Sequence, residues 1–255
     1  MSSKNERDGF SHGVYRTHLL NALSRFEFVN YESWQIGNPF VLWRHDVDLS
    51  LNRALRLAEI ENEFGVSSTF FLNLHSRFYN LLEADQTTLA RTLIKLGHEV
   101  GLHFDASFYA RDDFSGLEKR MELEANLVQN VLDVEVRAVS FHNPSPAILS
   151  WGRESLAGMV NAYSRSLREH VPYCSDSGGT WRYQTLHSFL SDPHVSCAQV
   201  LTHPGWWHET HLSPQQSIRR AIEGRSAAAN DGYLRTRRET GSLRETTDRD
   251  QSGSS

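Results

Sequence analysis

The spacing of apolar and polar positions changes repeatedly along the chain between the period of a strand and that of a helix. The apolar run from Phe40 to Trp43 has the composition of a buried strand. The next stretch, SLNRALRLAEIENEFG, has helical spacing, with Ser50 placed to cap a helix and Gly65 to end it. The pattern predicts further strands at 66–74, 98–104, 137–142, 170–177 and 197–204, and further helices at 11–28, 85–97 and 115–133.

Strands that alternate with helices of this length indicate an α/β fold built from parallel units. About six strands fit either an open doubly wound sheet or a barrel. Residues 1–37 are expected to form a helical extension packed on a domain at 38–225. Residues 226–255 are polar, mixed in charge and nearly devoid of large apolar groups, which predicts a disordered tail or a frayed helix.

Composition narrows the class of protein. The 255 residues carry a formal net charge of −5, which argues against nucleic acid or an anionic membrane as the main partner. No apolar run is long enough to span a membrane, and the first ten residues, MSSKNERDGF, contain no hydrophobic signal core. With only two cysteines, Cys174 and Cys197, and no CxxC pair, we expect a cytoplasmic protein with reduced thiols.

Acids and histidines follow most of the predicted strands. In parallel β/α folds the carboxyl ends of the strands lie on one rim, where catalytic groups gather. A single aspartate there is more often a helix cap or a turn residue, and a single histidine is usually structural. The repetition over several strands favours an active site. Its candidate residues are Asp46, Asp48, His103, Asp105, His142, Asp176 and His203.

Side-chain alternation assigns faces within the first strand. Asp46 and Asp48 share a face, and His45 between them points away. In the third strand, His103 and Asp105 share a face, whereas His98 sits at the opposite rim and is expected to be structural.

Such a set has the chemistry of a metal site. A carboxylate with one or two imidazoles and open positions suits a catalytic divalent ion such as zinc. No CxxC…CxxC or HExxH motif occurs, so the ligands must be assembled across strands. No GxSxG motif supports a serine nucleophile, and no glycine-rich loop follows the first strand.

Five motifs in order resemble those of the polysaccharide deacetylase superfamily, which includes chitin and peptidoglycan deacetylases. They are HDVD, STFFL, LGHEVGLHFD, SFHNPSP and LTHPGWW, within residues 38–210. The similarity is nearest to bacterial deacetylase-like proteins of surface-polysaccharide synthesis. The resemblance implies a distorted (β/α) barrel of about seven parallel strands and a divalent metal, usually zinc. It implies that Asp46 is the general base, Asp48 and His103 are metal ligands, and His203 is the general acid.

The chain departs from that family at the remaining ligand. The family places a second histidine four residues after the first, where this chain has Ser107. His142 is our first candidate for the missing ligand and Asp105 the second. Two other roles remain open for His142, namely orienting the base Asp46, as an arginine does in the family, or forming a turn before Asn143.

Three further residues are candidates for substrate binding. Trp206 and Trp207 could present a flat face to a sugar ring, although at least one could be buried beneath the rim. Asp176, in SDSGG, could bind sugar hydroxyls, orient a catalytic partner or form a turn.

These observations predict a metal-dependent hydrolase that removes an N- or O-acetyl group from a sugar or a polysaccharide precursor. An acetylated carbohydrate is the expected partner. The alternatives are a catalytically silent carbohydrate-binding relative, which would lack a third metal ligand, and a glycosidase-like hydrolase with two carboxylates facing each other across a cleft.

Overall fold

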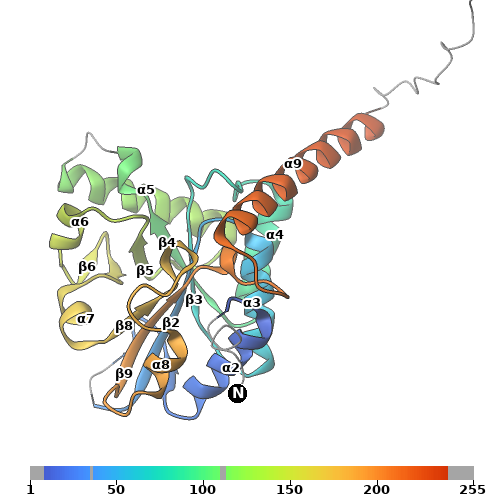
Figure 1. Cartoon of the computed structure of the whole chain (residues 1–255). Coiled ribbons are helices and arrows are strands. Elements are labelled where there is room, and N and C mark those ends of the chain that lie inside the picture. The colour runs from blue at the N-terminus through green and yellow to red at the C-terminus, as the bar shows by residue number, and fades with distance from the viewer. Residues whose placement is uncertain (1–8, 35–36, 110–112, 241–255) are drawn as a thin grey trace, which may run out of the picture.

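A single sheet runs through the computed structural model of this chain, which describes residues 9–34, 37–109 and 113–240. Its strands follow the order β6-β7-β5-β4-β3-β2-β9-β8, and β1 pairs with the first half of β2 (Figure 1). The strands are β1 (Glu27–Val29), β2 (Phe40–Val47), β3 (Thr69–Leu72), β4 (Glu99–Phe104), β5 (Ala138–Phe141), β6 (Ser155–Leu156), β7 (Met159–Asn161), β8 (Tyr173–Ser175) and β9 (Cys197–Thr202).

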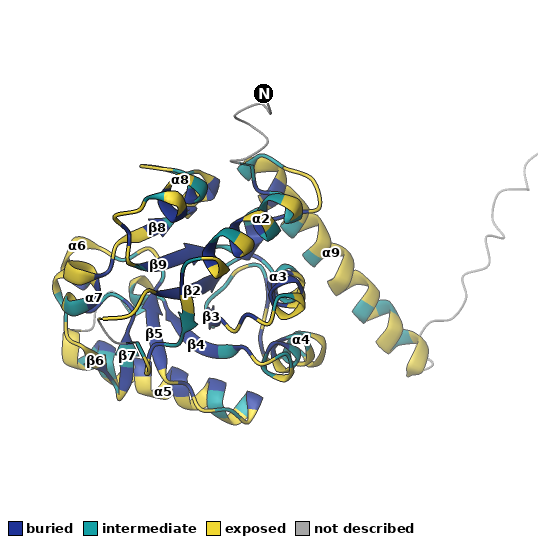
Figure 2. Ribbon diagram, turned by 90° about the horizontal axis from the view of Figure 1, so that it is seen from below, coloured by how far each residue is buried: buried dark blue, intermediate teal, exposed yellow. Residues whose placement is uncertain are grey.

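The strands pair in parallel throughout this order, apart from the antiparallel pair β6–β7. Viewed along the strands, the sheet curls into a half-barrel with helices on its outer side (Figure 2). The predicted α/β class with a barrel-like parallel sheet is therefore confirmed.

Helices connect successive strands, as the sequence pattern predicts. The main ones are α2 (His12–Leu23), α3 (Leu51–Glu63), α4 (Ala84–Lys95) and α5 (Phe114–Leu132). The Ser50 side chain accepts the N–H of Arg53 and so caps α3 where the sequence places a cap. The shorter helices α6 (Pro146–Ser150), α7 (Arg165–His170) and α8 (Leu186–Ser191), like β6 and β7, were not predicted. No helix in the described ranges is both long and apolar enough to cross a membrane.

Strand β2 has two differently used faces, and all eight of its residues are buried. Val41 and Trp43 face the helices, where they join an apolar cluster that includes Tyr15 of α2 and Leu57 of α3. Phe40 and Leu42 belong to a second apolar cluster, with Phe71 and Leu167. Because side chains alternate, the inner face that begins with Phe40 and Leu42 continues to Arg44 and Asp46. It therefore changes from apolar to charged toward the carboxyl end of the strand.

A buried polar cluster lies on the outer face of β2, centred on Glu61 of α3. One Glu61 oxygen lies 2.8 Å from His45 Nε2 and also accepts the Tyr15 hydroxyl. The other accepts the Ser68 hydroxyl at 2.6 Å and lies 3.5 Å from His98 Nδ1. The expectations that His45 points away from the site and that His98 is structural agree with these contacts. Glu61 thus ties three strands or strand entrances to two helices.

The N-terminal segment does more than supply a helix. Residues 27–29, within the expected helical extension 1–37, form β1 and pair in parallel with β2. Helix α2 packs through Tyr15, Leu19 and Ala22, which are completely buried. This segment is therefore a structural part of the sheet and its outer cover.

The C-terminal helix corrects the expected tail. Helix α9 (Pro214–Glu239) extends away from the domain (Figure 1), so residues 226–239 are helical, whereas 241–255 lie outside the described residues. Ser213 and Gln216 form a capping box at its start, and alanine, arginine and glutamate then favour its continuation. The lack of large apolar residues shows instead in burial, since Ser217 is the only buried residue of this helix.

Replacing Glu61 should test the buried cluster. Glu61→Ala leaves several buried polar groups without their partner, so we expect the free energy of unfolding at pH 7 to fall by roughly 3–5 kcal/mol. Glu59→Ala, which removes a carboxylate from an exposed pair with Arg56 in the same helix, should change it little. Urea denaturation of both variants measures the difference, and equal losses would contradict the role of Glu61.

The same pair of proteins predicts a pH dependence. Burial raises the pKa of Glu61, but the interactions with His45, His98 and Ser68 outweigh it, so the folded-state pKa is lowered. A carboxylate with a lowered pKa stabilises the fold above its unfolded pKa of about 4.3 and loses that contribution as the pH falls through its folded pKa. The stability difference between the wild-type chain and Glu61→Ala should therefore shrink between about pH 5 and 3. A difference that stays constant over this range would show that the Glu61 charge contributes nothing.

Candidate metal centre and active site

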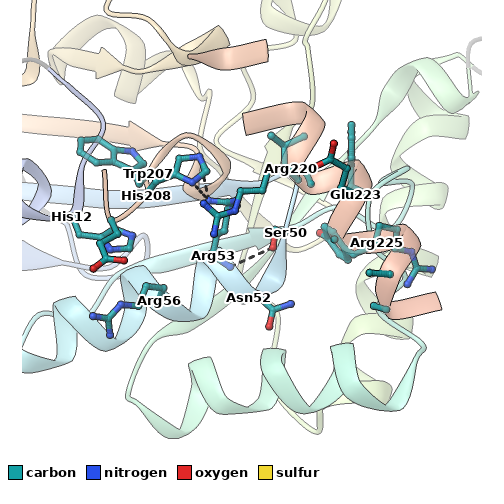
Figure 3. Close-up of a pocket in the computed structure, with 18 of the residues that line it drawn as sticks. His12, Ser50, Asn52, Arg53, Arg56, Trp207, His208, Arg220, Glu223 and Arg225 are labelled. Atoms are coloured by element: carbon teal, nitrogen blue, oxygen red, sulfur yellow. Dashed lines mark hydrogen bonds between the residues drawn. The ribbon is translucent and has the colours of Figure 1, made fainter. Parts of the chain in front are cut away.

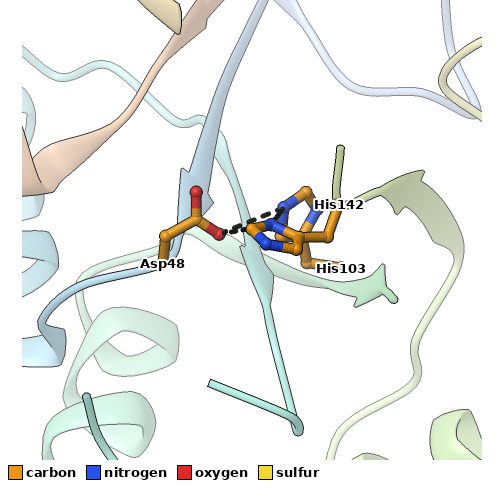
Figure 4. A group of neighbouring side chains, drawn as sticks. All are labelled: Asp48, His103 and His142. Atoms are coloured by element: carbon orange, nitrogen blue, oxygen red, sulfur yellow. Dashed lines mark hydrogen bonds and ion pairs between the residues drawn. The ribbon is translucent and has the colours of Figure 1, made fainter. Parts of the chain in front are cut away.

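Three side chains from different strands converge at the carboxyl rim of the sheet. Asp48 follows β2, His103 lies in β4 and His142 follows β5 (Figure 4). Asp48 Oδ1 lies 3.2 Å from His103 Nε2 and 3.1 Å from His142 Nδ1, and the two imidazole nitrogens are 3.3 Å apart. One ligand atom from each residue thus forms a nearly equilateral triangle.

The triangle fits a metal ion. Tetrahedral ligands at about 2.0–2.1 Å from zinc lie roughly 3.3 Å from one another, close to the observed edges. Asp48 Oδ1 is buried and makes no hydrogen bond of normal geometry within the described part of the chain, although two nitrogens lie within 3.2 Å of it. A buried oxygen left in this way needs a positive partner. One carboxylate and two imidazoles are the donor set expected for a catalytic zinc-type site.

The electrostatics of the triangle keep Asp48 ionised. Burial raises the pKa of Asp48, but hydrogen bonds and charge from His103 and His142 outweigh burial and hold it far below its usual range. In return, the Asp48 carboxylate raises the pKa of His142 against the effect of burial. The site therefore presents a fixed negative charge to a cation.

His103 is oriented by a relay on the inner face of the sheet. Strand register pairs His103 of β4 with Ser140 of β5. His103 Nδ1 lies 2.6 Å from Ser140 Oγ, which lies 3.2 Å from Asp46 Oδ1. When the Ser140 hydroxyl donates to Asp46, it accepts the Nδ1–H of His103 and leaves Nε2 free for a metal. The sequence analysis did not single out Ser140, although it placed Ser140 and His142 on one strand face.

Arg44 supplies the countercharge to Asp46. Its guanidinium lies 3.3 Å from Asp46 Oδ2, and both side chains are almost completely buried. The Arg44 guanidinium also donates to the Tyr163 hydroxyl at 2.8 Å and lies over the Tyr163 ring, 4.7 Å from its centroid. Arg44 therefore takes the place beside Asp46 that the sequence analysis allowed for His142. Alternation could have identified it, since Arg44, Asp46 and Asp48 are each two residues apart.

His203 lies on another side of Asp48 and is held by Asp176. His203 Nδ1 is 2.6 Å from Asp176 Oδ1, and His203 Nε2 is 3.9 Å from Asp48 Oδ2. Burial lowers the pKa of His203, but Asp176, together with the charges of Asp48 and Asp46, outweighs burial and raises it to about 9. Its free nitrogen is therefore directed at the site and carries a proton at neutral pH.

A close contact between two loops brings His203 to this position. A Cβ atom on Gly205 would lie 2.6 Å from Leu49 Cδ1, well inside normal contact distance. Only glycine permits the loop after β9 to approach the residue that follows Asp48 so closely.

Two residues expected to bind substrate are buried instead. Asp176 is 0% exposed and Trp207 is 1% exposed, and the Trp207 indole N–H donates to Asp176 Oδ2 at 2.8 Å. Both lie behind His203, which corrects the expectation that they contact a sugar. Trp206 is half-buried, and its role as a sugar platform remains a prediction.

The second candidate for the third ligand lies elsewhere. Asp105 Oδ1 accepts hydrogen bonds from the backbone N–H and the hydroxyl of Ser107, at 2.9 and 2.6 Å. Asp105 thus forms a turn, and the metal-binding group in the described ranges comprises Asp48, His103 and His142.

No family model and no curated protein matches the chain. Several solved structures share its general form. They include a CE4 family pseudoenzyme from Bacillus anthracis (14% identity, 76% of this chain and 63% of that chain, TM-score 0.42). A family 4 acetyl xylan esterase from Clostridium thermocellum, in complex with a cobalt ion, has 15% identity over 72% of this chain and 84% of that chain, with a TM-score of 0.44. The chitin deacetylase from Colletotrichum lindemuthianum has 17% identity over 74% and 84%, with a TM-score of 0.43.

This chain spans less than two thirds of the length of the pseudoenzyme and of its mutant forms. The similar structures include chitin and peptidoglycan deacetylases, the protein classes that the sequence motifs resemble. What this chain binds and catalyses is argued below from its own residues.

Removing His142 should weaken metal binding. We expect His142→Ala to lower zinc affinity more than about 100-fold, because loss of a supporting residue alone typically costs 10–100-fold. Asp105→Ala is the matched control and should retain zinc affinity, since Asp105 lies outside the triangle. Competition with a chromophoric chelator measures both variants, and normal zinc affinity in His142→Ala would exclude His142 as a ligand.

Proposed function

We propose that this chain is a metal-dependent hydrolase that removes an acetyl group from a carbohydrate. The observation that carries the proposal is the Asp48–His103–His142 triangle with His203 beside it and Asp46 behind it. Hydrolysis of an acetyl amide or ester requires an activated water, stabilisation of a developing oxyanion and a proton for the leaving group. The cluster has a residue suited to each requirement.

Asp48, His103 and His142 would hold the ion, which we propose to be zinc. A bound divalent ion supplies Lewis-acid polarisation of the acyl oxygen and lowers the pKa of a coordinated water. The negative charge on Asp48 and the Ser140-oriented ring of His103 prepare these side chains for that task.

Asp46 is the proposed general base. Its carboxylate is held by Arg44 on one oxygen and Ser140 on the other, so its orientation is fixed. Because Asp46 is only 1% exposed, the proton that it accepts comes from within the site and not from bulk solvent. Arg44 would stabilise the carboxylate between turnovers.

His203 is the proposed general acid. Asp176 fixes the proton on Nδ1 and leaves Nε2 directed toward Asp48. In the doubly protonated form, Nε2–H can be donated to the departing amine or alkoxide of the sugar. Trp207 holds the second oxygen of Asp176 and so maintains the pair.

The two alternative functions fit less well. A silent relative was expected to lack a third metal ligand, and His142 provides one. A glycosidase would need two carboxylates on opposite sides of a cleft. Asp46 and Asp48 come instead from one end of one strand, and Asp46 is occupied by Arg44 and Ser140.

Acetate release tests the proposed activity. We expect the zinc-loaded chain to release acetate from N-acetylglucosamine oligomers or from O-acetylated xylose oligomers, and the preferred substrate tells an amide from an ester specificity. Asp48→Asn should reduce release to the background rate, and Asp105→Asn should leave it near the wild-type rate. Absence of acetate from both substrates with stoichiometric zinc bound would favour the silent relative.

Asp176 should affect turnover without affecting the metal. Asp176→Asn removes the charge that orients His203, so we expect kcat to fall by about 10²- to 10⁴-fold, the usual contribution of a positioned acid or base. Zinc affinity should stay within about threefold, because Asp176 makes no contact with the triangle in the described part of the structure. A fall in zinc affinity that parallels the fall in kcat would show a merely structural role.

A further inference from the structure

A large basic cavity lies beside the site and takes no part in the proposed chemistry. It has a volume of about 1040 Å³ and is enclosed by the starts of α2 and α3, the loop after β9, and α9 (Figure 3). Its wall includes Leu49 and Ser50, which directly follow Asp48. Five arginines line it against two glutamates, although the whole chain has a net charge of −5. The five arginines are Arg16, Arg53, Arg56, Arg220 and Arg225.

Three of these arginines are paired with carboxylates. Arg16 pairs with Glu63, Arg56 with Glu59, and Arg225 with Glu83. Their charges are therefore largely balanced, and the excess positive charge of the cavity resides on Arg53 and Arg220.

Arg53 has a neutralising partner neither on its own helix nor on α9. Its guanidinium contacts the ring of His208, and no carboxylate in the described ranges lies within ion-pair distance of it. Arg220 of α9 reaches toward Arg53 and His208 (Figure 3) and likewise has no ion pair in those ranges. Burial and the charge of Arg220 lower the pKa of Arg53 to about 10. Two guanidiniums that repel each other within a cavity create a strong site for an anion.

His12 and His208 add neutral hydrogen-bonding groups to this arrangement. Burial, followed by the charges of Arg53 and Arg220, lowers the pKa of His208 to about 3. Burial and Arg56 also lower the pKa of His12. Both rings are therefore neutral near pH 7, and the positive charge presented to a ligand is that of the arginines.

We propose that this cavity binds a phosphate-bearing ligand through Arg53 and Arg220. The two guanidiniums come from different helices, and a tetrahedral phosphate can accept hydrogen bonds from several directions at once. A planar carboxylate is best matched by a single guanidinium fork. The volume far exceeds that of one phosphate group, so the ligand is a phosphate ester or diphosphate with a larger organic part.

This binding site stands independently of the proposed hydrolase. Residues of the cavity do not include the triangle, although Leu49 and His208 belong to the same loops as Asp48 and His203. If the proposed hydrolase is correct, the location places a phosphorylated group next to the acetyl-binding centre.

Titration calorimetry of the full chain with sodium pyrophosphate tests the site. We expect saturable binding with one ligand per chain and an affinity that falls as NaCl is raised. Arg220→Gln should weaken binding at least tenfold, because a hydrogen bond to a charged group contributes about 1.5–3 kcal/mol. Arg219→Gln, the exposed neighbour on α9 that does not line the cavity, should bind like the wild-type chain.

Two further variants complete the test. Arg53→Gln should weaken pyrophosphate binding to a similar extent, with its melting temperature recorded to establish that the variant is folded. Asp48→Asn, which removes a proposed metal ligand, should bind pyrophosphate as the wild-type chain does. No binding by the wild-type chain, equal binding by Arg220→Gln, or loss of binding in folded Asp48→Asn would each overturn the proposal, the last by placing the anion at the metal centre.

Discussion

Burial of three consecutive ionisable side chains in the central strand is the constraint on which this structure depends. Arg44, His45 and Asp46 of β2 are at most 1% exposed. An unpaired charge in such a position costs several kcal/mol, so each group needs a partner from another element. Those partners come from α3, β5, β9 and the segment after β7, and they bind the sheet, its helices and the rim together.

Alternation along β2 then separates structure from chemistry. His45 turns outward, where Glu61 and Thr202 hold both of its ring nitrogens, at 2.8 and 2.7 Å. Asp46 turns inward, where Arg44 and Ser140 fix it behind the metal-binding triangle. One strand therefore anchors an outer helix with one residue and prepares the active centre with the next. The outer cluster also explains why a strand that ends in catalytic groups can stay buried along its full length.

Much of this organisation could be predicted from the sequence. Alternation correctly separated His45 from Asp46 and Asp48, because residue spacing alone decides strand faces. The third ligand could not be decided between His142 and Asp105, because the choice depends on how far each strand continues before it turns. Ser140 depends on the register between β4 and β5, and the burial of Trp207 on the packing of α2; neither can be read from local sequence. The continuation of α9 was missed because core-forming capacity was weighed above helix propensity.

The most direct test of this account is the position of a metal in a zinc-loaded crystal, read from anomalous scattering at the zinc edge. The account predicts one strong peak per chain, bounded by Asp48 Oδ1, His103 Nε2 and His142 Nδ1 at about 2.0–2.2 Å from each. A peak elsewhere, or none at the triangle when zinc is present at saturating concentration, would contradict it.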